Sequence, residues 1–128
     1  MPKNDSQGLF FSYTRDFLFL RLREQDLRSD NTIKAYRQGL NRFRLFMRSQ
    51  YGIGVGKITF ETVTSDVVRD YLKNLVDNGL ALTTRNHRLT CIKQYLLYCS
   101  ERNVELTQFY IPVSKIRHTT VIQKKSFG

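Results

Sequence analysis

Hydrophobic residues recur at helical spacing between Ser29 and Gln50. In a helix each residue turns by about 100°, so this series falls on one face: Ile33, Tyr36, Leu40, Phe43 and Met47. A second series, named here the basic stripe, repeats at the same spacing and is centred roughly 100° away around the helix axis. Its members are Lys34, Arg37, Asn41, Arg44 and Arg48. The pattern predicts an amphipathic helix, capped by Ser29, with one buried and one cationic face.

Similar spacing predicts three more helices. The first spans 9–23 and has an apolar face too wide for one stripe, which is typical of a helix that is central to a core or that also contacts a partner. Its apolar residues are Leu9, Tyr13, Phe17 and Leu20, widened by Phe10, Phe11, Leu18 and Leu22. The next begins at the N-cap Thr64 and ends at Gly79. The last begins at Thr83 or Thr84 and runs to about Arg102.

The buried faces of these two later helices follow from the same periodicity. For the helix after Thr64 the face comprises Val68, Tyr71, Leu72, Leu75 and Val76. For the last helix it comprises Leu89, Ile92, Leu96 and Cys99, flanked by Tyr95. A short further turn is expected over 108–111, before Pro112. With no strand pattern, the chain is predicted to be all-α, a compact orthogonal bundle of four to five helices.

The segments between and around the helices set the domain limits. The segment 51–62 holds three alternating glycines but lacks the preceding strand and following helix of a nucleotide-binding loop, so it is expected to be a linker pinned by Ile58 and Phe60. We expect a disordered N-terminus over 1–8, a helical domain over 9–112, and a basic linker or tail over 113–128. The tail is basic through Lys115, Arg117, Lys124 and Lys125.

Charge and composition limit the classes of partner that this chain can bind. The 128 residues carry 21 Lys and Arg against 11 Asp and Glu, a net charge of +10. Such an excess favours an anionic partner, nucleic acid ahead of an acidic membrane surface. No run of 18 apolar residues predicts a membrane span. We therefore expect a cytoplasmic protein that associates with the nucleoid when bound to DNA.

The residues that could carry chemistry are few. Cys91 and Cys99 lie about 12 Å apart along one helix, too far for a disulfide, and are expected to be reduced and half-buried. With His87 and His118 they do not make a zinc site. No nucleophile–base arrangement or carboxylate pair is recognisable. We expect no catalytic residues, no metal and no cofactor in this chain.

Two helices carry candidate DNA-binding residues. The stretch from Lys34 to Arg48 contains no acidic residue, whereas a solvated helix face usually mixes charges; Arg42, off the stripe, is expected to be solvated. On the last helix a polar stripe faces away from the core and suits base edges in a major groove: Thr83, His87, Thr90 and Gln94. Asn86 and Lys93 lie beside it, and Thr84 and Arg85 lie where helical N–H groups can meet a phosphate.

Three segments together resemble the core-binding domain of tyrosine recombinases, the phage-integrase family. The first resembles its second helix: Ser29-x-x-Thr32-x-x-x-Tyr36-x-x-x-Leu40-x-x-Phe43-x-x-Phe46. The second resembles its third helix and turn: Thr64-x-Asp66-Val67-Val68-x-x-Tyr71-Leu72, leading to Gly79-Leu80. The third resembles its fourth helix: Thr84-x-Asn86-x-x-Leu89-x-x-Ile92-x-x-Tyr95. The resemblance covers roughly 9–117.

This resemblance implies a SAM-like domain that clamps one side of a recombination site, with helices 29–50 and 83–102 in the major groove. By position it implies DNA contacts for Thr32, Lys34, Arg37, Asn41, Arg44, Thr84, Asn86, His87, Thr90 and Gln94. It also implies a parent recombinase that cuts through a phosphotyrosine, a C-terminal catalytic domain in that parent, and other protomers in a DNA-bound tetramer. The family's His-x-x-Arg pair is not found at His87 or His118, which predicts that this chain ends in the interdomain linker.

Two other functions fit parts of the sequence. A helical protein-interaction adaptor would explain the wide apolar face over 9–23, although not the acid-free basic stripe. A helix-turn-helix transcriptional regulator or an RNA-binding protein would need a basic third helix, where only Arg69 and Lys73 are available.

Overall fold

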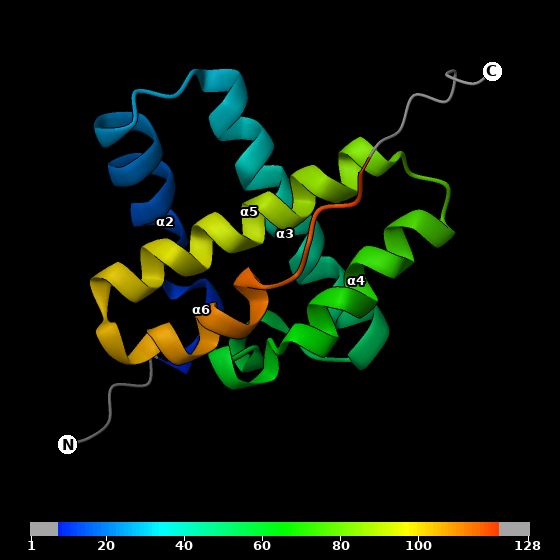
Figure 1. Cartoon of the computed structure of the whole chain (residues 1–128). Coiled ribbons are helices and arrows are strands. Elements are labelled where there is room, and N and C mark those ends of the chain that lie inside the picture. Colours follow the sequence, from blue (N-terminus) through cyan, green and yellow to red (C-terminus); the bar gives the residue numbers. More distant parts are fainter. Residues whose placement is uncertain (1–7, 121–128) are drawn as a thin grey trace.

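The computed structural model describes residues 8–120, and this part contains helices and turns with no strand beyond one isolated bridge between Leu9 and Thr59. The N-terminal helical segment has three parts: η1 (Phe10–Tyr13), α2 (Thr14–Asp16) and η2 (Phe17–Gln25). The longer helices are α3 (Asp30–Tyr51), α4 (Ser65–Asp77), α5 (Leu82–Arg102) and α6 (Thr107–Ser114). Short 3-10 turns are η3 (Val55–Lys57), η4 (Phe60–Thr62) and η5 (Val104–Leu106). The predicted all-α class is confirmed (Figure 1).

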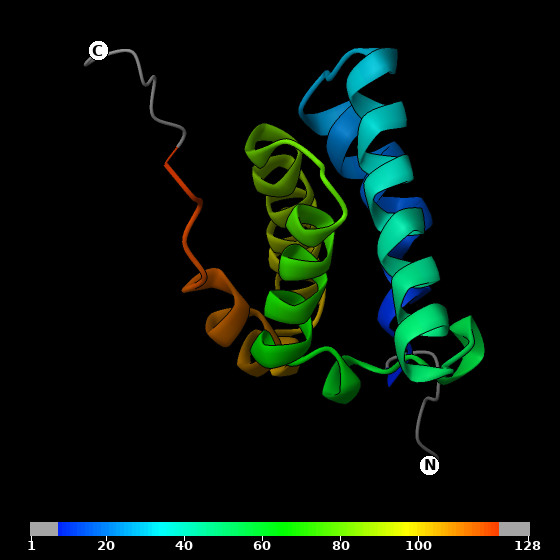
Figure 2. The same ribbon diagram turned by 90° about the vertical axis from the view of Figure 1, so that its right-hand side faces the viewer.

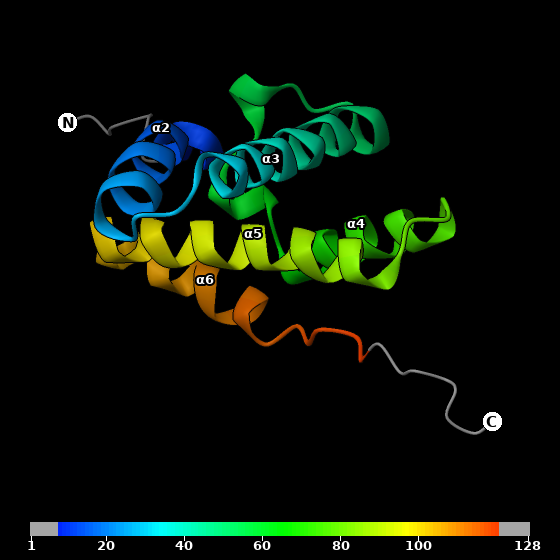
Figure 3. The same ribbon diagram turned by 90° about the horizontal axis from the view of Figure 1, so that it is seen from above.

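The helices form three layers. Figure 3 shows η2 and α3 in one layer, α5 with α4 in the middle, and α6 on the other side of α5; Figure 2 shows the same order from the side. Aromatic rings join the first two layers. Phe10 lies 5.8 Å from Phe43 of α3 and 5.2 Å from Tyr95 of α5, between ring centroids, and Phe43 lies 5.1 Å from Tyr71 of α4. The four elements that carry these rings, η1, α3, α4 and α5, therefore share one core.

Helix α3 forms as the hydrophobic pattern predicts. All five residues of its apolar series are buried. The Ser29 hydroxyl accepts a hydrogen bond from the Thr32 backbone N–H at 3.1 Å, which caps the first turn. Gly52 ends the helix at φ 70°, a left-handed conformation that glycine adopts at little cost. The predicted linker is also pinned as expected, since Ile58 and Phe60 are buried.

The N-terminal segment departs from the predicted single α-helix. Its second half, η2, is a π-helix, in which the Asp26 N–H bonds to the Arg21 carbonyl five residues back. The wider turn moves the apolar face, so Phe17, Leu18 and Leu22 are buried while Leu20 is 37% exposed. The expectation that Leu20 faces the core is therefore wrong, because it assumed α-helical spacing.

Two details of α4 and α5 also differ from prediction. Thr64 caps α4 as expected, but Val76 is 42% exposed, since it lies about 100° around the helix from buried Leu75. Helix α5 begins at Leu82 with Ala81 as its N-cap, so neither Thr83 nor Thr84 is the cap. The chain reaches Ala81 in an extended conformation directly after the turn at Gly79, which starts the helix earlier.

The burial of side chains also differs from the predictions for the two cysteines and for the last helix. Cys91 and Cys99 are fully buried rather than half-buried, and both are free thiols. Helix α6 continues through Pro112 instead of stopping before it, because Val113 is buried against the core and holds the following turn in place. Ile116 is buried as well, so core packing extends past residue 112. The predicted tail cations Lys124 and Lys125, like residues 1–7, lie outside the described part.

Two further findings concern the described residues 8–120. None of their helices is long and apolar enough to cross a membrane. No group of three or more His, Cys, Asp or Glu side chains is placed to hold a metal ion.

Candidate nucleic-acid interface

Helices α3 and α5 cross at Gly39, where the backbone of α3 approaches a side chain of α5. A Cβ built at residue 39 would stand 2.8 Å from the Cys91 sulfur, closer than real Cβ atoms come to a neighbour. One turn earlier, the rings of Tyr36 and His87 pack edge to face with centroids 5.7 Å apart. A Cβ at residue 39 would therefore require the Cys91 side chain or one of the two helices to shift.

A polar groove follows the crossing on the outside. It is lined by Ala35, Gln38, Thr83, Thr84, His87 and Arg88. Arg88 also donates to the Tyr71 hydroxyl at 3.2 Å, which holds its guanidinium near the crossing. Burial, together with the charge of Arg88, lowers the pKa of His87. The imidazole is therefore neutral at physiological pH, with one donor and one acceptor nitrogen.

The basic stripe lies on the side of α3 that faces away from α5. By helical geometry its five residues are turned by about 140–180° from Gly39, which marks the side in contact with α5. Lys34, Arg37 and Arg48 are exposed, while Arg44 is partly buried and donates two hydrogen bonds to the Asn41 side-chain oxygen, at 3.0 and 2.6 Å. Within residues 8–120 no ion pair involves any of these four cations.

The predicted residues of α5 fall into two groups. Thr83 and Gln94 are exposed and His87 is half-buried beside α3. On the other side, Arg85, Asn86 and Thr90 bond to the chain that follows α6: Arg117, Thr119 and His118 respectively. Lys93 is partly buried beside this second group, and burial is the main cause of the lowering of its pKa.

Two predicted residues near the helix starts have local roles. Thr32 belongs to the N-cap of α3, since its backbone N–H and its hydroxyl both bond to the Ser29 hydroxyl. Thr84 lies in the first turn of α5 and lines the groove with Gln38. Because the N-cap Ala81 has no side-chain acceptor, the first backbone N–H groups of α5 have no cap bond.

The structure adds residues that the sequence patterns missed. Gln38 and Ala35 line the groove with His87, and Arg42 lies with Arg88 around a second hollow between α3 and α4. A signal for them existed, because 35, 38 and 42 share a helical face, but an alanine, a glutamine and an arginine form neither a uniformly apolar nor a uniformly charged stripe.

The fold and surface define an all-helical domain whose two longest helices cross and carry polar and cationic side chains outward. Residues 17–103 match the family model of the phage integrase N-terminal SAM-like domain. The chain therefore belongs to the phage integrase family, and the match covers its N-terminal SAM-like domain, which is not the catalytic domain. No curated protein and no solved structure shows a significant match to this chain.

The match confirms the predicted family and the SAM-like fold, and it associates the chain with integrase-type recombination. It runs from the start of η2 to the end of α5, so both crossing helices lie within it.

Proposed function

We propose that this chain is the DNA-binding module of a site-specific tyrosine recombinase, with α3 and α5 facing the major groove of the recombination site. The observation that carries the proposal is the crossing at Gly39 and Cys91, which packs an acid-free cationic helix against a polar helix. Membership of the integrase family supports DNA as the anionic partner of a chain with a net charge of +10.

The two helices take different tasks in this proposal. The basic stripe contacts phosphates, which gives affinity and register with little sequence information. Thr83, His87 and Gln94 face base edges, since hydroxyl, neutral imidazole and amide groups can both donate and accept. The uncapped N–H groups at the start of α5 contact a phosphate, assisted by the helix dipole.

The rest of the recombinase supplies the other functions. A catalytic domain of the parent protein cuts and rejoins strands through a phosphotyrosine, and this module needs no metal or cofactor. Protomers assemble as a tetramer on DNA, with Phe19 and Leu20, exposed by 41% and 37%, as a contact between neighbours. The complex acts in the cytoplasm, at the nucleoid.

A salt titration of binding to a mixed-sequence duplex tests the proposal. Four to six phosphate contacts predict a slope of log affinity against log salt of about −4 to −5. Absence of binding at low salt, or binding with little salt dependence, would exclude it. Either result would favour the adaptor function, for which exposed Phe19 and Leu20 would then be the interaction surface.

A further inference from the structure

The chain that follows α6 runs along α5 on the side away from α3. Figure 3 shows this segment, residues 115–120, beside α5 and opposite α3, and in Figure 1 it passes in front of α5. Its start is anchored in the core by Ile116, which is 4% exposed. The side chains of Lys115, Arg117 and His118 remain exposed along it.

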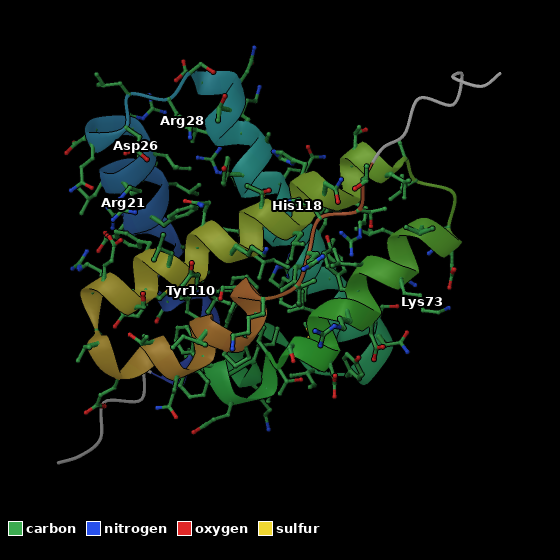
Figure 4. The ribbon with its side chains drawn as sticks, viewed as in Figure 1. Arg21, Asp26, Arg28, Lys73, Tyr110 and His118 are labelled. Atoms are coloured by element: carbon green, nitrogen blue, oxygen red, sulfur yellow. The ribbon has the colours of Figure 1, made fainter. Side chains whose placement is uncertain are left out.

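Three residues of α5 hold this segment. The Asn86 side chain makes two hydrogen bonds with the backbone of Thr119: its amide nitrogen donates to the carbonyl at 2.7 Å, and its oxygen accepts from the N–H at 2.8 Å. The Arg85 guanidinium donates to the Arg117 carbonyl at 3.0 Å. The Thr90 hydroxyl and the His118 Nε2 atom lie 2.8 Å apart (His118 is labelled in Figure 4). We name these contacts the Asn86 clamp.

The clamp changes the role that the sequence predicts for Asn86. An amide group whose nitrogen and oxygen both bond to Thr119 is already engaged, so base reading would require breaking the clamp. The Arg117 side chain remains exposed, in a hollow that it lines with Lys73 of α4, whereas the His118 ring is held by Thr90. The clamp therefore holds the side chains of residues 115–119 beside α5, on the side of this helix away from α3.

Across the molecule the order is α3, α5 and the clamped tail (Figure 3), and helical geometry turns the basic stripe to the side of α3 away from α5. The centre of this surface, around Thr83 and His87, is polar, and cationic residues lie at both edges. A major groove about 12 Å wide is likewise bordered by two phosphate strands. Cations on the α3 edge alone would meet only one of those strands.

We propose that the Asn86 clamp holds residues 115–119 as a second phosphate-binding edge, so that the duplex is gripped on both sides of the groove that α3 and α5 face. This inference rests on the proposed DNA-binding function. In it, Asn86 is a positioning residue that acts through the tail, and Arg117 makes the phosphate contact.

Four variants of the 128-residue chain test the clamp, with a mixed-sequence duplex of about 20 base pairs as the probe. Asn86→Ala removes the amide from α5, and Thr119→Pro removes the tail N–H without altering α5. Arg117→Gln removes one charge, which should make the salt slope shallower by about 0.9. Asn86→Ala and Thr119→Pro should lower the affinity for the duplex by a similar factor. The double variant Asn86→Ala/Thr119→Pro should lower it no further than either single variant.

Amide exchange at Thr119 provides a readout that does not depend on DNA. The Thr119 N–H should be protected in the free chain and should exchange faster in Asn86→Ala, at an unchanged thermal midpoint. Arg15→Gln is the control for charge, because Arg15 is exposed on α2 whereas Arg117 lies beside α4; it should leave the slope unchanged.

Two binding results would overturn the inference while leaving the proposed function intact. One is duplex binding that is unchanged in Asn86→Ala, Thr119→Pro and Arg117→Gln. The other is weaker binding in Asn86→Ala with normal binding in Thr119→Pro, which would mean that Asn86 contacts DNA directly. An unprotected Thr119 amide in the free chain would overturn it as well, and failure of the unmodified chain to bind any duplex would remove both proposals.

Discussion

Gly39 of α3 lies against Cys91 of α5 so closely that a Cβ at residue 39 would stand 2.8 Å from the Cys91 sulfur. Alanine is intrinsically better than glycine inside a helix, by about 1 kcal/mol. At this crossing the added methyl would instead push the two helices apart. The contact therefore links one small residue to the geometry of the whole candidate interface.

We expect Gly39→Ala to destabilise the domain by about 1–3 kcal/mol, because overpacking outweighs helix propensity in a close-packed contact. Urea unfolding followed by circular dichroism measures the change. Combining it with Cys91→Ala should restore part of the loss, since the clashing sulfur is removed. Gly54→Ala is the matched control, as nothing lies within 4 Å of a Cβ there. A Gly39→Ala variant that is more stable than the unmodified chain would contradict the close approach of α3 and α5 at residue 39.

The caps of α4 and α5 give a second prediction. Thr64→Ala should cost about 1 kcal/mol of stability, because its hydroxyl accepts from the Val67 N–H. Thr83→Ala should cost much less, because the N-cap of α5 is Ala81 and Thr83 is exposed within the first turn. Thermal unfolding of the two variants measures the difference, and equal losses would contradict the observed start of α5.

The buried thiols predict a loss of stability at alkaline pH. Burial raises the pKa of both Cys91 and Cys99 to about 12, whereas a thiol in the unfolded chain titrates near pH 8.5. Between these values the unfolded chain releases protons that the folded chain retains. Their contribution to stability is therefore complete below about pH 8.5 and is lost as the pH rises toward 12, by about 1.4 kcal/mol per pH unit for each thiol.

Urea unfolding between pH 9 and about pH 10 measures this slope before tyrosines add to it. Burial also raises the pKa of Tyr71 and Tyr36, so they contribute at still higher pH. The double variant Cys91→Ala/Cys99→Ala should show a shallower slope, whatever its absolute stability. A slope that matches that of the unmodified chain would show that the thiols are accessible when folded.

The basic stripe and the polar stripe predict different effects on DNA binding. Replacing Lys34, Arg37, Arg44 and Arg48 by Gln should weaken binding to all sequences alike and make the salt slope shallower by about 3.6, or 0.9 for each charge. Gln94→Ala should leave that slope unchanged and alter sequence preference, because Gln94 is exposed on the polar stripe. Binding to a randomised duplex pool separates the two effects. Normal binding by the fourfold variant would exclude the basic stripe as a phosphate-binding surface.

Core packing beyond Pro112 predicts where the folded domain ends. A chain ending at residue 112 loses buried Val113 and Ile116. Full burial of such side chains is worth about 1.5–3 kcal/mol each, so the loss should be about 3–6 kcal/mol. A chain ending at residue 120 should be as stable as the full chain in the same urea titration. Equal stability of the two shortened chains would place the boundary at 112.

Much of the local structure could be predicted from particular residues. Ser29, Thr64 and Gly79 mark helix ends through their own conformational preferences and hydrogen-bonding groups, so neighbours elsewhere in the chain matter little. The buried face of α3 followed from its apolar period. Prediction failed at Leu20, because the π-winding of η2 changes the number of residues per turn, and at Thr83, because the extended approach through Ala81 starts the helix earlier.

The sequence by itself determined the all-helical class, the apolar face of α3, the acid-free basic stripe and the family, because each depends on the order of residues along the chain. Only the tertiary structure decided which faces meet. It placed Gly39 on Cys91, turned the basic stripe away from α5, and engaged Asn86 with Thr119 across 33 residues of chain. Periodicity specifies the direction of a side chain relative to its own helix, whereas packing between helices determines what that direction faces.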